Sequence, residues 1–281
     1  MGAVVILRPV AARYSEIDWY STPEWYDILY APDTAREVGF LRDVLDCYGR
    51  PGRARRSRRA RVLEPACGSG RLVVALAREG YSVVGFDLSP EMVAYTRRRL
   101  KAAGLRARVE RARLESFAED MRLGRPFELA YCPVSSFKYI LSEAGARAHL
   151  EGVAAALAPG GLYVLGLHLN TYRETRPDRE RWVGERDGVR VVCNVQTWPP
   201  DRRRRRERMR SRLRVQQQGE ERRSETVWSW RTYSARQILA LLASVPSLEI
   251  VGVHDFTYDI ERSWDLSELE YDTMFVLRKR A

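Results

Sequence analysis

Short apolar runs and helical stretches alternate through the middle of the chain. Runs suited to buried strands cover Val62–Leu63, Val83–Phe86 and Phe127–Cys132, and another short strand is predicted at Ala107–Arg111. Apolar residues at helical spacing separate the first two runs, at Leu72–Ala77. Strands that alternate with helices in this way predict an α/β domain built on a parallel sheet.

The pattern changes after a predicted fifth strand at Leu162–Leu169. A helix that opens at Ser142 leads to this strand, and Pro159-Gly160-Gly161 ends the helix near Leu157. Residues 170–233 then contain three β-rich runs with turn residues between them, which predict an antiparallel insertion. These runs are Val189–Trp198, Met209–Gln217 and Thr226–Thr232.

The end of the chain returns to the first pattern. Ser234–Leu242 predicts a helix with Ser234 as its N-cap. Two further strands follow at Leu248–Phe256 and Thr273–Leu277. We therefore expect four parts: an aromatic-rich helical cap at 1–50, a core at 51–169, the insertion at 170–233, and completion of the core at 234–281.

Candidate binding chemistry lies in Arg61–Asp87. A small-residue turn after the first strand lets backbone approach a ligand, and helix N–H groups point at it. Asp87 ends the second strand, where a carboxylate can accept both hydroxyls of a ribose. The dinucleotide fingerprint is not met, because Val73 occupies its third glycine position. Glu64 would repel a pyrophosphate and suits a ligand that carries a cation.

The run E-P-A-C-G-S-G-R with an acid at the end of the next strand resembles the class I S-adenosylmethionine-dependent methyltransferases. The L-A-P-G-G-L turn at Leu157–Leu162 strengthens the match. The resemblance implies a Rossmann-like doubly wound seven-stranded sheet with a C-terminal antiparallel hairpin, an N-terminal helical cap and an antiparallel β insertion. It also implies S-adenosyl-L-methionine as cofactor and S-adenosyl-L-homocysteine as product. A nucleotide fold that uses another cofactor, or a degenerate copy that binds nothing, is the alternative.

The same resemblance assigns the cofactor contacts. Glu64 lies near the methionine amino group and Asp87 holds the ribose. The implied contacts as a set are Tyr26, Tyr30, Glu64, Ala66, Gly68, Gly70, Asp87, Leu88, Met92, Arg113, Leu114, Pro133 and Val134. Tyr26 and Tyr30 match a Y-D-x-x-Y segment and could stabilise a sulfonium by cation–π attraction, or pack the cap onto the core. Met92 is either an adenine contact or plain core.

Arg113 departs from the family pattern, which usually places an acid or amide there to bond the adenine amino group. Arginine carries donors only and cannot accept from that amine. Adenine recognition would then depend on backbone near Leu114, on apolar packing, or on arginine stacking.

The acceptor side of the site follows the fourth and fifth strands. Our first hypothesis is N- or O-methylation of a small molecule bound by Tyr20, Trp25, Tyr139, Asn170 and Trp230. His168 is a candidate general base and could equally be a structural histidine. Cys132 is expected to be a buried structural cysteine, because it lacks the proline–cysteine order of nucleophilic methylases. No residue cluster suggests a metal.

Composition leaves other partners open. The 281-residue chain has a net charge of +11, which suits nucleic acid, but its only lysines are Lys101, Lys138 and Lys279. Such arginine bias is also typical of a GC-rich genome. An RNA or protein methyltransferase that uses the arginine surface, and a non-catalytic relative, therefore remain alternatives. The insertion could serve as a lid or a homodimer contact.

Cysteine usage and hydropathy indicate the compartment. Four scattered cysteines without a C-x-x-C pair fit a reducing cytoplasm. No stretch reaches a membrane-spanning length, and the apolar start, Met1–Arg8, lacks the basic region of a signal peptide. The arginine-rich stretch Gly49–Arg61 is predicted to be a solvated linker, with phosphate binding as the alternative.

Overall fold

The computed structural model describes residues 14–49, 60–265, 267 and 272–281. The apolar start of the chain and the arginine-rich linker at 50–59 lie outside the described residues. No helix in the described part of the chain is long and apolar enough to cross a membrane.

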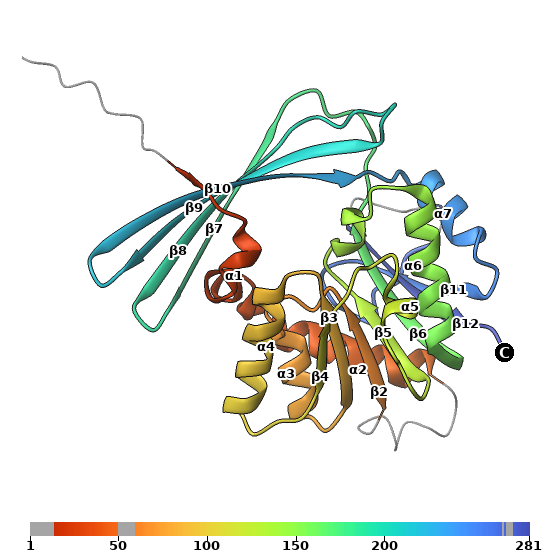
Figure 1. The fold of residues 1–281 in the computed structure, drawn as a ribbon. Helices are drawn as coiled ribbons and strands as arrows, with labels where there is room; N and C mark the ends of the chain where they lie inside the picture. Colours follow the sequence, from red (N-terminus) through yellow and green to blue (C-terminus); the bar gives the residue numbers. More distant parts are fainter. Residues whose placement is uncertain (1–13, 50–59, 266, 268–271) are drawn as a thin grey trace, which may run out of the picture.

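A seven-stranded sheet forms the core, in the order β11-β12-β6-β5-β2-β3-β4 (Figure 1). Its strands are β2 (Arg61–Pro65), β3 (Ser82–Asp87), β4 (Arg108–Arg111), β5 (Phe127–Cys132), β6 (Leu157–His168), β11 (Leu248–His254) and β12 (Asp272–Lys279). The strands from β6 to β4 run parallel, whereas β12 is antiparallel to both β6 and β11. The predicted α/β fold with a C-terminal antiparallel pair is confirmed.

Helices cover both faces of this sheet. On one face lie α2 (Thr34–Tyr48), α3 (Arg71–Arg78) and α4 (Pro90–Ala102), which share a buried cluster with apolar residues of β2 and β3. On the other face lie α5 (Phe117–Asp120), α6 (Glu143–Ala156) and α7 (Ala235–Ala243). Serine caps start three of them as the sequence predicts: the side chains of Ser89, Ser142 and Ser234 accept backbone N–H bonds from the first turns of α4, α6 and α7.

A second sheet of five strands stands above the core in Figure 1, in the order β1-β10-β9-β8-β7. Its strands are β1 (Ser15–Glu16), β7 (Asp178–Arg186), β8 (Val189–Thr197), β9 (Arg206–Gln217) and β10 (Glu220–Arg231). Helix α1 (Pro23–Tyr30), which follows the short 3-10 turn η1 (Trp19–Ser21), packs on it in a cluster with Val191, Cys193 and Val195. The insertion therefore meets the N-terminal segment in one apolar layer.

Several elements differ from the sequence prediction, among them β7, β6 and α2. Strand β7 was not predicted, because D-R-E-R-W-V-G-E-R lies at an exposed edge and lacks alternating apolar residues. Strand β6 begins at Leu157 instead of Leu162, since the proline–glycine turn is taken up as an irregularity in its pairing with β5. Helix α2 was assigned to the cap, but its apolar face packs into the core cluster.

Candidate active site

The Asp87 carboxylate is held by two backbone N–H groups, one of them from the turn after β2. The Gly68 N–H donates to Asp87 Oδ2 at 2.8 Å, and the Ser89 N–H donates to Oδ1 at 2.9 Å. Both oxygens are thus oriented while further lone pairs face the cavity. Gly70 begins α3 with a φ of 70°, and a Cβ there would lie 2.2 Å from Thr96 Cγ2. Only glycine satisfies both the backbone angle and this approach.

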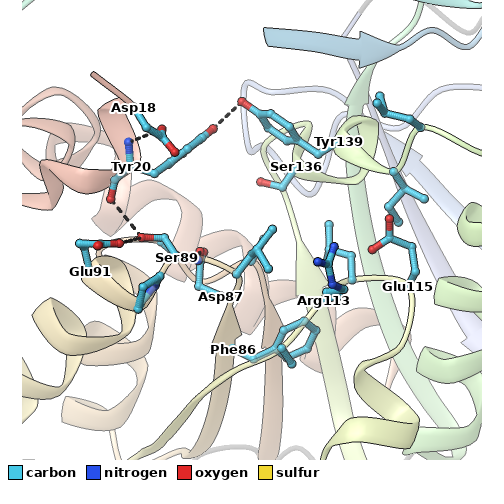
Figure 2. A pocket seen from close by; sticks show the side chains of 18 of the residues that line it. Asp18, Tyr20, Phe86, Asp87, Ser89, Glu91, Arg113, Glu115, Ser136 and Tyr139 are labelled. Atoms are coloured by element: carbon cyan, nitrogen blue, oxygen red, sulfur yellow. Dashed lines mark hydrogen bonds between the residues drawn. The ribbon is translucent and has the colours of Figure 1, made fainter. Parts of the chain in front are cut away.

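A large cavity of about 700 Å³ opens over the ends of β3 and β4 (Figure 2). Its floor is Phe86, Asp87 and Leu88, and Ala112 to Glu115 continue it. Its other walls come from η1, the start of α4 and the segment after β5. The remaining residues that line it are Asp18, Tyr20, Tyr26, Ala66, Gly68, Ser89, Pro90, Glu91, Ser136, Tyr139, Ile140, Leu141, Ser142 and Arg206. Polar groups from the cap, the core and the insertion therefore converge on one space.

A small cavity of about 40 Å³ adjoins it and shares Tyr26, Ala66, Gly68 and Ser136. Glu64 lines this cavity, is 5% exposed, and accepts a bond from the Tyr131 hydroxyl at 3.0 Å. Burial raises the pKa of Glu64 to about 8, although the bond from Tyr131 opposes the rise. The unliganded carboxyl is therefore mostly protonated at neutral pH, and a cationic ligand would draw it into the charged form.

Arg71 lines the same small cavity. Its Nη2 donates to both carboxylate oxygens of Glu37, at 2.7 and 2.8 Å. Its Nη1 is buried and has no hydrogen-bond partner among the described residues. A buried guanidinium donor without a partner is costly, and it suits an anionic ligand group at this end of the site.

The roof of the large cavity is closed by a contact between two tyrosines. The hydroxyl groups of Tyr20, from η1, and Tyr139, after β5, hydrogen bond to each other (Figure 2). The Ser89 hydroxyl donates to the Tyr20 carbonyl at 3.1 Å and fixes η1 over α4. Burial raises the pKa of both tyrosine hydroxyls above the ordinary range, so they stay protonated at neutral pH.

The predicted cofactor residues divide between the cavities and the interior. Ten of them line one or both cavities: Tyr26, Glu64, Ala66, Gly68, Asp87, Leu88, Arg113, Leu114, Pro133 and Val134. Tyr30 stacks on Tyr26 with ring centroids 4.4 Å apart and packs on the second sheet. Gly70 shapes the start of α3, and Met92 is fully buried in the first turn of α4.

Two of the predicted acceptor residues, Tyr20 and Tyr139, line the large cavity, and three do not. Trp25 packs in the apolar layer under the second sheet. Trp230 lies against Tyr139, with the two rings edge-on and their centroids 5.7 Å apart. Asn170 is buried and its side chain accepts a bond from the Tyr172 N–H at 2.7 Å.

His168 lies outside both cavity linings. Its Nδ1 is 2.6 Å from Asp272 Oδ1, and its ring meets Phe256 edge-on at 5.0 Å. Cys132 is buried, which raises the pKa of its thiol to about 12 and leaves it without nucleophilic character, as expected of a structural cysteine.

Several lining residues were missed by the sequence analysis. Asp18 and Glu115 lie in loops without a recognisable motif, and Ser136 begins a short 3-10 helix after β5. Arg206 ends a run of five arginines, Arg202–Arg206, and its side chain is half-buried and lines the large cavity. Arg71 was overlooked although it ends the E-P-A-C-G-S-G-R run.

This sheet order, the glycine turn after β2 and the acid at the end of β3 define a class I methyltransferase fold. The sequence profile of the methyltransferase domain matches residues 62–161. The resemblance to the S-adenosylmethionine-dependent methyltransferases drawn from the sequence is thus confirmed over this part of the chain.

Known relatives are similar over part of their length. A dTDP-3-amino-3,4,6-trideoxy-alpha-D-glucopyranose N,N-dimethyltransferase of Streptomyces venezuelae is 28% identical over 50% of this chain and 54% of that protein. A glycine N-methyltransferase of Rattus norvegicus is 31% identical over 37% of this chain and 39% of that protein. The chain spans between 39% and 56% of the length of the first curated relatives it matches.

Among solved structures, a sugar N-methyltransferase from Streptoalloteichus superposes with a TM-score of 0.69 at 21% identity, covering 100% of both chains. At this identity the likeness is one of fold.

Proposed function

We propose that this protein transfers a methyl group from S-adenosylmethionine to an amine nitrogen of a small molecule. The observation that carries the proposal is the acceptor end of the large cavity, the part bounded by Tyr20, Ser136, Tyr139 and Arg206. It is enclosed by side chains and lined by hydroxyl groups. The activities for which the relatives are named, N-methylation of glycine and of nucleotide-linked amino sugars, support the same class of acceptor.

The two cavities fit the cofactor by shape and by charge. When bound, it supplies an activated methyl group on a sulfonium. Asp87 would accept the ribose hydroxyls, and Ala112 and Leu114 would pack against the adenine. Glu64 would accept from the amino group, while the unpartnered Nη1 of Arg71 would donate to the carboxylate. The residues shared by both cavities, with Ser136 among them, would then surround the methyl group.

An amine acceptor suits the tyrosine-lined end better than an alcohol. Methyl transfer is an in-line displacement, so the protein can act largely by orienting the acceptor lone pair toward the methyl. None of the described residues that line the two cavities is a histidine. The hydroxyl groups of Tyr20 and Tyr139 stay protonated and orient an acceptor instead of deprotonating it. A neutral amine needs no base before it attacks.

The arginine-rich surface supports the macromolecular alternative less well. On the second sheet, Arg212 pairs with Glu225 at 2.5 Å, and Arg214 and Arg223 both pair with Glu221. Carboxylates thus offset much of the positive charge along β9 and β10. An RNA or protein acceptor would instead need an uncompensated tract.

We further propose that two copies associate through the second sheet. Val183 on β7 and Val227 on β10 are 51% and 47% exposed. Light scattering should then report a dimer, which Val183→Glu would convert to monomer. A monomeric wild-type protein at micromolar concentration would refute the contact.

The proposed function is tested in two stages. Calorimetric titration of the protein with S-adenosylmethionine and S-adenosylhomocysteine should show binding that Asp87→Ala abolishes. Small amines, including amino sugars, amino acids and their nucleotide conjugates, should then accept labelled methyl from the donor. Binding of neither form of the cofactor would refute the enzyme, and transfer only to RNA or protein would refute the small-molecule acceptor.

A further inference from the structure

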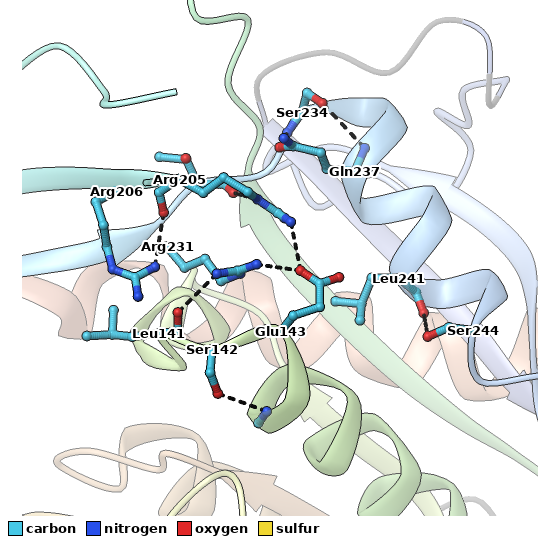
Figure 3. Close-up of polar contacts among 12 residues, drawn as sticks. Leu141, Ser142, Glu143, Arg205, Arg206, Arg231, Ser234, Gln237, Leu241 and Ser244 are labelled. Atoms are coloured by element: carbon cyan, nitrogen blue, oxygen red, sulfur yellow. Dashed lines mark hydrogen bonds and ion pairs between the residues drawn. The ribbon is translucent and has the colours of Figure 1, made fainter. Parts of the chain in front are cut away.

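Three guanidinium groups gather where the second sheet reaches the large cavity (Figure 3). We call Arg205, Arg206 and Arg231 the arginine cluster. Arg206 begins β9 and Arg231 ends β10, and the two residues are direct partners in the antiparallel register. Side chains opposite each other on neighbouring strands share a face, where like charges destabilise the pair. The sheet therefore holds two positive charges together at its end.

One carboxylate binds two of the three arginines. Glu143, at the start of α6, accepts from Arg205 Nη1 at 2.7 Å and from Arg231 Nη2 through the same oxygen, Oε2 (Figure 3). Arg206 Nη1 donates to the Arg205 carbonyl at 3.2 Å, and Arg206 forms no ion pair within the described residues. Three positive charges thus face one negative charge. Burial and the two neighbouring arginines together lower the pKa of Arg206.

The cluster also has donors to spare. Arg205 Nη2 and Arg231 Nε are buried without a hydrogen-bond partner in the described part of the chain. Arg231 is only 7% exposed, so water satisfies little of this deficit. A buried donor left unpaired costs free energy that a ligand with several acceptor oxygens would recover.

The backbone directs this cluster at the cavity. Arg205 adopts a φ of 53°, and its carbonyl accepts from the Thr232 N–H at 3.2 Å, which ties the start of β9 to the end of β10. Arg231 Nη1 donates to the Leu141 carbonyl at 3.0 Å, and Leu141 and Arg206 both line the large cavity. The backbone angle at Arg205 is strained for a residue with a side chain, which marks a built feature instead of a loose loop.

Acidic side chains line other parts of the large cavity. Asp18 comes from the cap, Asp87 from β3, Glu91 from α4 and Glu115 from the segment after β4. Asp18 accepts from the Tyr20 N–H, and Asp87 accepts from two backbone N–H groups. The cavity is therefore mostly acidic on the side of the core strands, where Arg113 also lines it, and basic where the second sheet meets it.

We propose that the methyl acceptor carries a phosphate group and that Arg206, with Arg205 and Arg231 behind it, binds that group. The proposal deepens the small-molecule function and rests on it. Phosphate fits because it bears more than one negative charge and offers several oxygens, and guanidinium groups bind it through paired N–H donors. The cluster has both the surplus charge and the surplus donors for such a group.

Direct binding tests the proposal without a turnover assay. Inorganic pyrophosphate and a nucleoside diphosphate are titrated calorimetrically into the protein saturated with S-adenosylhomocysteine. Both should bind, and Arg206→Gln should weaken binding at least about tenfold, as expected for one lost charged hydrogen-bond partner. Arg203→Gln, in the same arginine run but exposed, is the matched control and should bind as the wild type does.

The outcomes distinguish failure of the phosphate site from failure of the proposed methyltransferase function. Both variants should bind S-adenosylhomocysteine as tightly as the wild type does. If the wild type itself does not bind S-adenosylhomocysteine, the proposed function is refuted instead. Tighter binding of the nucleoside diphosphate than of pyrophosphate would place the phosphate on a nucleotide-linked acceptor, and equal binding would indicate a simpler phosphate ester. The proposal would be overturned if the protein bound the cofactor but neither phosphate compound. It would also be overturned if Arg203→Gln weakened phosphate binding as much as Arg206→Gln does. Binding of a short single-stranded RNA that needs both arginines would overturn it in favour of a nucleic-acid surface.

Discussion

Asp27 of α1 and Arg99 of α4 are joined by a 2.6 Å hydrogen bond from Nη1 to Oδ1, although they lie 72 residues apart. The same Asp27 oxygen accepts from the Ser69 hydroxyl at 2.8 Å, and its other oxygen accepts from Arg186 Nη1 of β7 at 2.6 Å. The Asp27 side chain is fully buried. One carboxylate thus fastens the cap to the glycine turn, to the core and to the second sheet.

Replacement of Asp27 with asparagine should therefore destabilise the protein and loosen the site together. Loss of one partner of a buried ion pair costs about 3 kcal/mol. Urea unfolding should show this loss, and cofactor affinity should fall because a neutral amide with one acceptor oxygen no longer holds Ser69, Arg99 and Arg186 together. The control Asp33→Asn removes an exposed pair with Arg36 and should cost less than about 1 kcal/mol. Equal costs for the two variants would contradict the role of Asp27.

Two glycines with similar backbone angles should respond differently to alanine. Gly70 and Gly104 have φ values of 70° and 64°, but only at Gly70 would the new Cβ strike a neighbour, Thr96. Gly104→Ala should cost about 1 kcal/mol from backbone strain alone. Gly70→Ala should cost about 3 kcal/mol, since strain and overpacking add. Thermal and urea unfolding would measure both, and a Gly70→Ala protein as stable as Gly104→Ala would contradict the clash.

Cofactor binding should release a proton from Glu64. Its pKa of about 8 in the unliganded protein means that it carries a proton at pH 7 and must lose it to accept from a ligand ammonium. Affinity should rise between pH 6 and 8 until the ligand amino group itself deprotonates near about pH 8. Calorimetry at pH 7 in buffers of different ionisation enthalpy should report release of about one proton.

Glu64→Gln is the control for this titration. It should bind the cofactor more weakly and release no proton, because the amide does not ionise. The same linkage acts on the stability of the folded protein, because folding raises the pKa of Glu64. Its contribution to stability is complete below the unfolded pKa of 4.5 and is lost as the pH rises toward the folded pKa of about 8. Buffer-independent binding heats in the wild type would show that Glu64 is already ionised.

The tyrosine roof should matter for the acceptor and not for the cofactor. Tyr139→Phe removes the hydroxyl partner of Tyr20 without emptying space. We expect kcat/KM for the acceptor to fall about tenfold, while S-adenosylhomocysteine affinity stays within about twofold. Steady-state kinetics and calorimetry on the same preparation give both readouts. Loss of cofactor affinity in Tyr139→Phe would instead place the hydroxyl pair at the cofactor.

The core could be predicted from the sequence because its signals are local. The glycine turn, Asp87 at the end of β3, and serine caps such as Ser89 and Ser234 each depend on neighbours within a few residues. Strands buried on both faces read as continuous apolar runs, as β5 does. Most of the residues predicted to contact the cofactor belong to these elements and line the two cavities, and their role there stays a prediction.

The acceptor side could not be predicted because its contacts join distant segments. Arg231 at the end of β10 meets Glu143 at the start of α6, and Arg206 is brought beside Arg231 only by the register of β9 with β10. The place of Arg71 in the site could not be predicted, because its partner, Glu37, lies in a helix that the sequence assigned to the cap. Trp25 and Trp230 were expected at the acceptor, but aromatic residues near a site serve equally as packing behind it.

The pairing of β1 with β10 has a consequence for how the protein is made. Ser15 and Glu16 align with Ser224 and Glu225, and the Trp19 N–H donates to Thr226 across 207 positions. The first described residues must therefore wait for most of the chain to leave the ribosome before they find their partners. The roof over the acceptor can be assembled only after β10 has emerged, so a chain that stalls before β10 would contain the glycine turn and Asp87 yet lack an enclosed place for a substrate.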